Sequence, residues 1–195
     1  MESTLKLALF GDSFGVSMQD RPYSSWVDLL SQDFDITNHC ECGVGQYKIL
    51  KQLQSADLEQ FDKILITHTS ATRVYVKHNP LHTDSKYHRN CDIIFSDIDQ
   101  GDTEFSQACR LYFKHIFDLD YAVDLHNMIC QQIDQLCQDL PVVHITHFDY
   151  KKLYQFPNMI NFHELFLQHR GPVNHYDQYG NGQVYQSLLK VLWSE

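Results

Sequence analysis

The sequence predicts an α/β protein whose central parallel sheet has about five strands. Apolar runs of strand length alternate with stretches in which apolar residues recur every three to four positions. This alternation favours a parallel sheet, because right-handed crossovers place helices on both of its faces. The 195 residues contain no internal repeat and no interdomain linker, so we expect a single domain over 1–195.

Five segments are predicted to form the strands of this sheet. They cover 5–10, 34–40, 62–69, 141–148 and, as a short strand or an extended segment, 159–162. The fourth opens on Pro141, where no ladder donor is needed. With helices between the strands, the pattern predicts a three-layer α/β/α sandwich of the flavodoxin-like kind.

Helical signals separate these strands. Ser25 can cap a helix that starts at Trp26, because Asp28 lies three residues later, as in a capping box. Further helical periodicity is seen from 47 to 53, over 103–140 with a break at 118–120, and from 180 to 192. The segment 74–101 has no periodicity, and we expect a long irregular loop there, since loops of this length are usually functional covers or disordered.

Charge and composition exclude several function classes. The formal net charge is −10 and no Lys/Arg-rich run occurs, so we expect no nucleic-acid partner. No apolar stretch approaches the roughly 20 residues of a membrane span. The first strand begins almost at once, so we expect no signal peptide. Six cysteines in such a chain are expected to be reduced thiols, and we expect a cytoplasmic location.

A polar motif, Gly11-Asp12-Ser13, ends the first predicted strand. Ligands of open α/β sheets bind at the carboxyl ends of the strands. A serine on such a turn presents its hydroxyl beside backbone N–H groups, as an acyl-transfer nucleophile requires. The alternative is that Ser13 only caps a turn, as serine often does.

Two further positions fit the same chemistry. His175 stands before the last helix, and a neutral imidazole there can accept the serine proton and return it to a leaving group. Gly43 follows the second strand, and its N–H group together with that of Ser13 can hold a developing oxyanion.

These blocks resemble those of the SGNH (GDSL-type) hydrolase superfamily: Gly11-Asp12-Ser13 near the N-terminus, Asn38 with Gly43 after the second strand, and Asn174-His175 before the terminal helix. The resemblance covers most of the chain. It implies a serine esterase or acyl hydrolase that acts on a small-molecule or glycan ester. The reaction would proceed through an acyl-enzyme on Ser13, with His175 as general base and with no metal or cofactor.

The sequence departs from the family pattern at the oxyanion hole. The family carries an asparagine after the third strand, whereas residues 67–73 contain none. Thr69 or Ser70 is the expected replacement donor, unless the hole uses backbone donors alone. Losing one side-chain donor costs about two to three orders of magnitude in rate.

The second departure concerns the acid that orients the histidine. Pro172 occupies the position, three residues before His175, where the family usually has aspartate. We hypothesise that a backbone carbonyl orients the imidazole, since proline keeps its C=O group. Glu164 or Asp149, arriving from a loop, is the other option.

Other residue groups allow rival interpretations. Histidines and cysteines gather around 39–42, 78–91 and 144–147, but none has the paired spacing of a structural zinc site, and we expect no metal. His144 and His147 are three apart on a strand and should point to opposite faces. One helical segment has an aromatic face that we interpret as core, formed by Phe105, Tyr112, Phe113, Phe117 and Tyr121.

The incomplete site leaves a second function open. Without the asparagine and the acid, the chain could be a catalytically reduced SGNH-like module that binds a glycan or a protein partner. Arg73 and Arg89 are candidates for recognising an anionic substrate. The identity of the ester and the oligomeric state are not specified by any motif.

Overall fold

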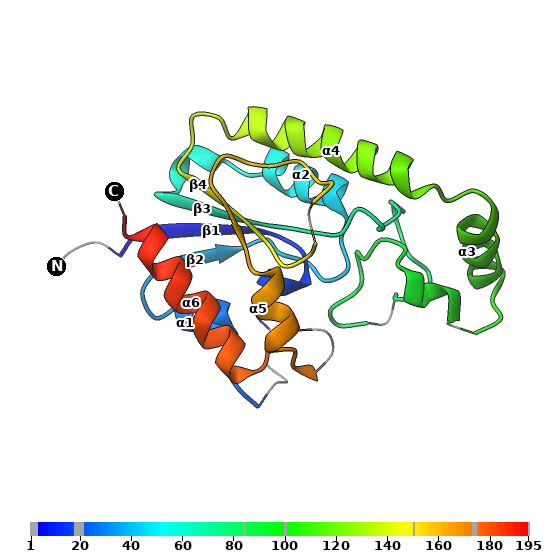
Figure 1. The fold of residues 1–195 in the computed structure, drawn as a ribbon, viewed down its shortest axis with the longest axis horizontal. Helices are drawn as coiled ribbons and strands as arrows, with labels where there is room; N and C mark the ends of the chain where they lie inside the picture. Colours follow the sequence, from blue (N-terminus) through cyan, green and yellow to red (C-terminus); the bar gives the residue numbers. More distant parts are fainter. Residues whose placement is uncertain are drawn as a thin grey trace.

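The fold is a five-stranded parallel sheet between two helical layers. The computed structural model describes residues 4–17, 22–83, 85–99, 101–149, 151–172 and 175–194. The strands lie in the order β2-β1-β3-β4-β5, and every neighbouring pair is parallel (Figure 1). They are β1 (Lys6–Gly11), β2 (Asp35–Asn38), β3 (Lys63–His68), β4 (Val142–Thr146) and β5 (Met159–Asn161). The predicted fold class and all five predicted strands are confirmed.

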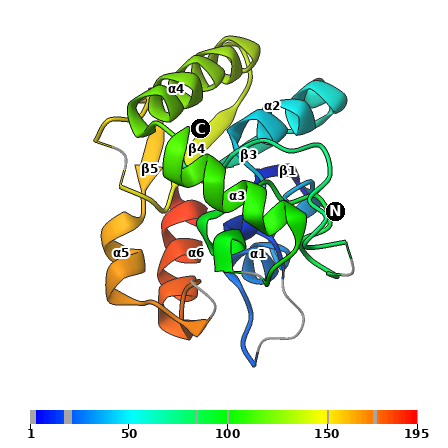
Figure 2. The ribbon, with the colours of Figure 1, turned by 90° about the vertical axis from the view of Figure 1, so that its right-hand side faces the viewer.

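Helices cover both faces of the sheet, as Figures 1 and 2 show. On one face, α1 (Trp26–Leu30), α5 (His163–Gln168) and α6 (Gln178–Leu192) pack over a core that includes Leu7, Leu9 and Ile145. On the other face, α2 (Gln46–Ser55) and α4 (Leu119–Leu136) pack over Ala8, Ile64 and Ile66. The side chains of alternate strand residues therefore point into opposite cores.

The helix boundaries follow their capping residues. Ser25 and Asp28 form the predicted capping box at the start of α1. The predicted break at 118–120 is confirmed, because α3 (Glu104–His115) ends before it and Asp118 caps α4. The sequence did not indicate α5, whose N-cap residue Phe162 makes no side-chain cap. A single short turn without a cap carries too little periodicity to be recognised.

The long loop between β3 and α3 is held in place by two buried aspartates. Asp92 accepts hydrogen bonds from the backbone N–H groups of Gly45 and Val76 and forms an ion pair with Lys48 at 2.9 Å. Asp97 bonds to His82 at 2.8 Å from within the 3-10 turn η3 (Phe95–Asp99). In its described parts, the predicted irregular loop has a defined conformation.

The aromatic face over 105–121 is not core, so that interpretation is wrong. None of its five rings is buried, and Tyr121 is 65% exposed. The physical reason is visible in Figure 1, where α3 and the start of α4 extend past the end of the sheet. Phe95 packs against Phe113 and Phe117 there, and Tyr121 stays exposed.

The cysteines of this chain form no disulfide bond. All six cysteines are free thiols, and five of them are buried. Burial raises the pKa of Cys137 to about 11, which keeps that thiol protonated. Among the described residues, no helix is long and apolar enough to cross a membrane.

Candidate active site

The turn after β1 requires glycine and presents Ser13. Gly11 has φ +139°, and a Cβ added to it would lie 2.3 Å from the carbonyl oxygen of Thr67. Only glycine allows β1 and β3 to approach so closely there. Asp12 then caps the 3-10 turn η1 (Ser13–Gly15), because its carboxylate accepts the Phe14 N–H group at 3.1 Å. Ser13 is thereby held, partly exposed, at the carboxyl end of β1.

Asp12 itself is a buried structural carboxylate. Its side chain is fully buried and lies 3.5 Å from Nη2 of Arg73, while the Thr67 hydroxyl donates to it at 3.4 Å. Burial raises the pKa of Asp12, and the Arg73 guanidinium opposes that rise. Asp12 therefore holds the turn and anchors Arg73, which is a structural role and not that of a triad acid.

Gly43, the glycine of the second sequence block, lies in the loop between β2 and α2. Its φ is +77°, and a Cβ on it would stand 2.5 Å from Cβ of Cys91. The same added Cβ would lie 3.6 Å from Nη1 of Arg73, so the guanidinium adjoins this glycine. The Gly43 carbonyl accepts the Asp92 N–H group at 3.0 Å, which joins the glycine to the long loop.

His175 reaches the site from the segment before α6. The Gly171 N–H group donates to the His175 carbonyl at 2.6 Å, and the His175 N–H group donates to the Pro172 carbonyl at 3.4 Å. The imidazole is 7% exposed, and its centroid lies 4.9 Å from that of the Phe14 ring. Phe14 follows Ser13, so this ring contact brings the two predicted reactive residues to one place. Asn174 lies outside the described residues.

One cavity of about 380 Å³ joins the separate parts of the site. Ser13, Gly43 and His175 all line it, although they come from three distant segments of the chain. Apolar side chains form much of the remaining wall, namely Phe14, Ile94, Phe148 and Phe166. Such a mixture of a polar centre and apolar walls suits a small ester.

Ser70 is not among the residues that line this cavity. Its hydroxyl pairs with that of Thr72 at 2.9 Å, and it borders two other cavities. The side chain that does line the cavity from this segment is Arg73. A bulky cation three positions further along the chain carries no motif, so spacing alone could not indicate it.

Two further basic residues line the cavity and were missed from the sequence. Arg170 and His88 both border it, whereas the predicted candidate Arg89 is exposed and does not. Burial lowers the pKa of His88, which favours its neutral form. Both lie in loops, where no periodic pattern shows the direction of a side chain.

His68, His144 and His147 are buried and pack against other rings. His144 and His147 face opposite sides of the sheet, as predicted: His144 stacks on Phe156, and His147 stacks on Phe14 at 4.1 Å. His68 bonds to His144 at 2.9 Å. Among the described residues, no group of three or more His, Cys, Asp or Glu side chains is arranged to hold a metal ion.

Comparison with known proteins finds similar solved structures but no sequence match. No family model matches the chain, and no curated protein matches it in sequence. Among solved structures, the chain is similar to an acetylxylan esterase from Geobacillus stearothermophilus with a TM-score of 0.54 and 14% identity, over 99% of this chain and 96% of the other. A serine-to-alanine variant of that enzyme, described as a catalytic mutant, gives a TM-score of 0.55 at 11% identity, over 100% and 97%.

This likeness shows a shared α/β fold along the whole chain. The structure thus defines a protein with the fold of these esterases and with a serine, a glycine and a histidine around one cavity.

Proposed function

We propose that the chain is a serine hydrolase of carboxylic esters, with acetyl esters of glycans as the favoured class. The observation that carries this proposal is the single cavity shared by Ser13, Gly43 and His175. The overall likeness to solved acetylxylan esterases supports it, since those enzymes remove acetyl groups from a glycan. The apolar cavity walls suit a short acyl group.

The proposed reaction is a two-step acyl transfer. Ser13 Oγ attacks the ester carbonyl carbon while the imidazole of His175 accepts its proton. The bond to the alcohol breaks, and His175 returns the proton to the departing oxygen. Water then attacks the acyl-enzyme, with its proton passing through His175 to Ser13 Oγ, and the carboxylic acid leaves.

Arg73 is proposed as the side chain that takes the place of the family's oxyanion asparagine. Its guanidinium adjoins Gly43 and lines the cavity, and its side chain is only 13% exposed. A fixed cation beside the N–H groups of Ser13 and Gly43 would stabilise the negative charge that develops on the carbonyl oxygen. Ser70 was the sequence-based candidate for this role, and its place at other cavities favours Arg73.

Orientation of His175 is proposed to rest on backbone carbonyls. Glu164 and Asp149 are both exposed, and neither lines the cavity. We therefore expect Glu164→Gln and Asp149→Asn to keep the kcat/KM of the wild type for 4-nitrophenyl acetate, within about twofold. A loss above tenfold in either variant, with folding intact by circular dichroism, would assign the acid to that residue.

Labelling with a fluorophosphonate probe tests the nucleophile directly. We expect peptide mass spectrometry to find the probe on Ser13, and we expect Ser13→Ala and His175→Ala to remain unlabelled. The reason is that only a serine activated by a neighbouring base reacts with such probes. Ser17, which bonds to Asp28, serves as an internal control that should stay unlabelled.

The binding-module alternative has a specific observation in its favour, namely the missing acid three residues before His175. A folded wild-type protein that leaves Ser13 unlabelled would contradict the hydrolase and favour that alternative. Labelling at Ser13 that persists in His175→Ala would keep the nucleophile but remove His175 as its base.

A further inference from the structure

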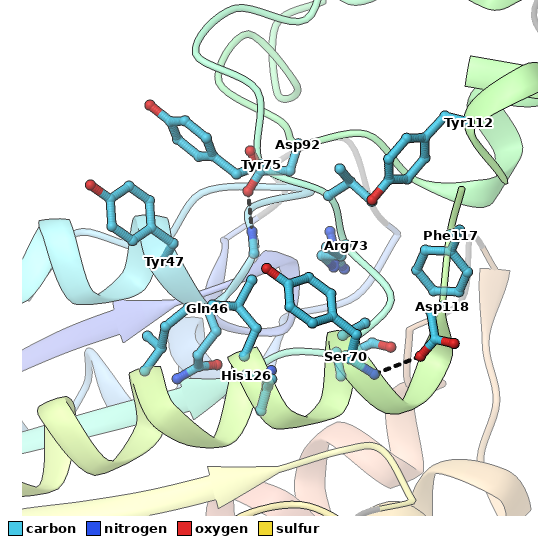
Figure 3. Close-up of a pocket in the computed structure, with 17 residues that line it drawn as sticks. Gln46, Tyr47, Ser70, Arg73, Tyr75, Asp92, Tyr112, Phe117, Asp118 and His126 are labelled. Carbon is cyan, nitrogen blue, oxygen red and sulfur yellow. Dashed lines mark hydrogen bonds between the residues drawn. The ribbon is translucent and has the colours of Figure 1, made fainter. Parts of the chain in front are cut away.

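A second cavity, of about 100 Å³, is lined by aromatic rings from three parts of the chain. Figure 3 shows Tyr47 and Tyr75 on one side, Tyr112 and Phe117 on the other, and Arg73 between them. Tyr121 also lines it. Arg73 lines the catalytic cavity as well, so the two cavities meet at one side chain.

Several of the aromatic side chains around this cavity are exposed to solvent. Tyr47 is 37%, Tyr75 52% and Tyr121 65% exposed. Tyr47 and Tyr75 pack edge to face with centroids 4.9 Å apart, which presents part of their surface to the cavity. Grouped exposed aromatic surface in a hollow marks a binding site more often than a core defect.

Four tyrosines and one phenylalanine line this cavity, and tyrosine offers an apolar face together with a hydroxyl group. A pyranose ring has the matching character, since its C–H faces are apolar and its rim carries hydroxyl groups. Stacking against such rings buries the sugar face, while its rim stays in contact with water or with the phenol hydroxyls. A long acyl chain would gain nothing from the hydroxyl groups.

We infer that this aromatic cavity binds the sugar ring that forms the alcohol part of the ester. The inference rests on the proposed esterase function. The acyl group would lie against Ser13, where Phe14, Phe148 and Phe166 already supply an apolar wall. The alcohol part would pass Arg73 and stack on the tyrosines of the long loop and of α4.

The test compares two substrates in variants that remove single rings. Tyr121→Ala and Tyr75→Ala alter exposed side chains, so both variants should fold. We expect each to lower kcat/KM for peracetylated xylobiose about tenfold, mainly through KM, because one stacking contact is lost. For 4-nitrophenyl acetate, which has no sugar, kcat/KM should stay within twofold of the wild type.

Two matched controls sharpen this test. Tyr121→Phe keeps the ring and should retain most of the activity on peracetylated xylobiose. Trp193→Ala removes another exposed ring. Trp193 caps the C-terminal end of α6, is 56% exposed and packs on Phe34, and this variant should keep the wild-type kcat/KM for both substrates.

The possible outcomes distinguish failure of the esterase proposal from failure of the sugar-site proposal. A wild type that cleaves neither ester contradicts the esterase itself. Cleavage of 4-nitrophenyl acetate alone, or equal activity of wild type and ring variants on the sugar ester, overturns the sugar site and leaves the esterase standing. If the ring variants lose kcat/KM for 4-nitrophenyl octanoate and keep it for the sugar ester, the cavity binds an acyl chain. That result also overturns the inference.

Discussion

Replacing Arg73 with glutamine is expected to reduce kcat for ester hydrolysis by about 10²- to 10³-fold, which is the usual effect of losing one oxyanion donor. The same change should lower the free energy of unfolding by about 3–5 kcal/mol, because the fully buried carboxylate of Asp12 loses its cation. Steady-state kinetics on 4-nitrophenyl acetate and urea denaturation measure the two effects separately.

A double variant separates these two roles of Arg73. In Asp12→Asn with Arg73→Gln, no charge is left buried, and the asparagine oxygen can still accept the Phe14 N–H group. We expect this protein to regain most of the lost stability and none of the lost rate. Recovery of the rate in the double variant would mean that Arg73 acts only through Asp12 and does not touch the reacting oxygen.

Acid should destabilise this protein well above the pH at which carboxylates are protonated. Burial lowers the pKa of His126 and His144 to about 4 and that of His147 to about 3, and it lowers the pKa of His68 in the same direction. The unfolded chain binds these protons near pH 6.5. The stability is therefore complete above pH 6.5 and decreases as the pH falls towards 4.

For His126, His144 and His147, the expected loss of unfolding free energy between pH 7 and pH 5 is about 2 kcal/mol each, because in this range the unfolded chain binds a proton at each position and the folded chain does not. The raised pKa of Asp12 acts in the opposite direction, but it is one group against four. Urea denaturation at the two pH values gives the difference directly.

A single buried histidine provides the matched variant. His126→Leu removes one titrating group from an apolar site and should shrink the loss between pH 7 and pH 5 by about 2 kcal/mol. His115→Gln changes an exposed side chain at the end of α3 and should leave the loss unchanged. Equal pH dependence in His126→Leu and wild type would show that burial of His126 does not set the acid sensitivity.

The sheet and the ends of its strands were predictable because they obey local rules. Continuous apolar runs of strand length indicate strands that are buried on both faces. The carboxyl ends of parallel strands meet at one edge, so Ser13 and Gly43 were selected as candidates from their positions. His175 followed from its place before the last helix. The structure brings these three residues to one cavity.

The parts that escaped prediction depend on how loops pack. Arg170 and His88 reach the cavity from loops, whose side-chain directions follow no period. Arg73 was predicted only as a candidate for recognising an anionic substrate. Its contact with Asp12 could not be predicted, because Asp12 is 61 residues away in the sequence. The aromatic face of α3 and α4 was taken for core, since periodicity reveals that a face is apolar but not whether a second layer covers it.

Asp92 joins the long loop to Gly43, the glycine that lines the cavity with Ser13 and His175. Its N–H group donates to the Gly43 carbonyl, and its carboxylate accepts the Gly45 N–H group at 2.6 Å. Asn90 adds a second link, because its side chain donates to the Glu41 carboxylate at 2.6 Å, so the end of the loop is joined to the segment that carries Gly43. A designer who replaces other residues of this loop, while keeping Asn90, Asp92, Asp97 and the Asp97 partners Asn79 and His82, would change the cavity wall without removing the contacts that hold the loop.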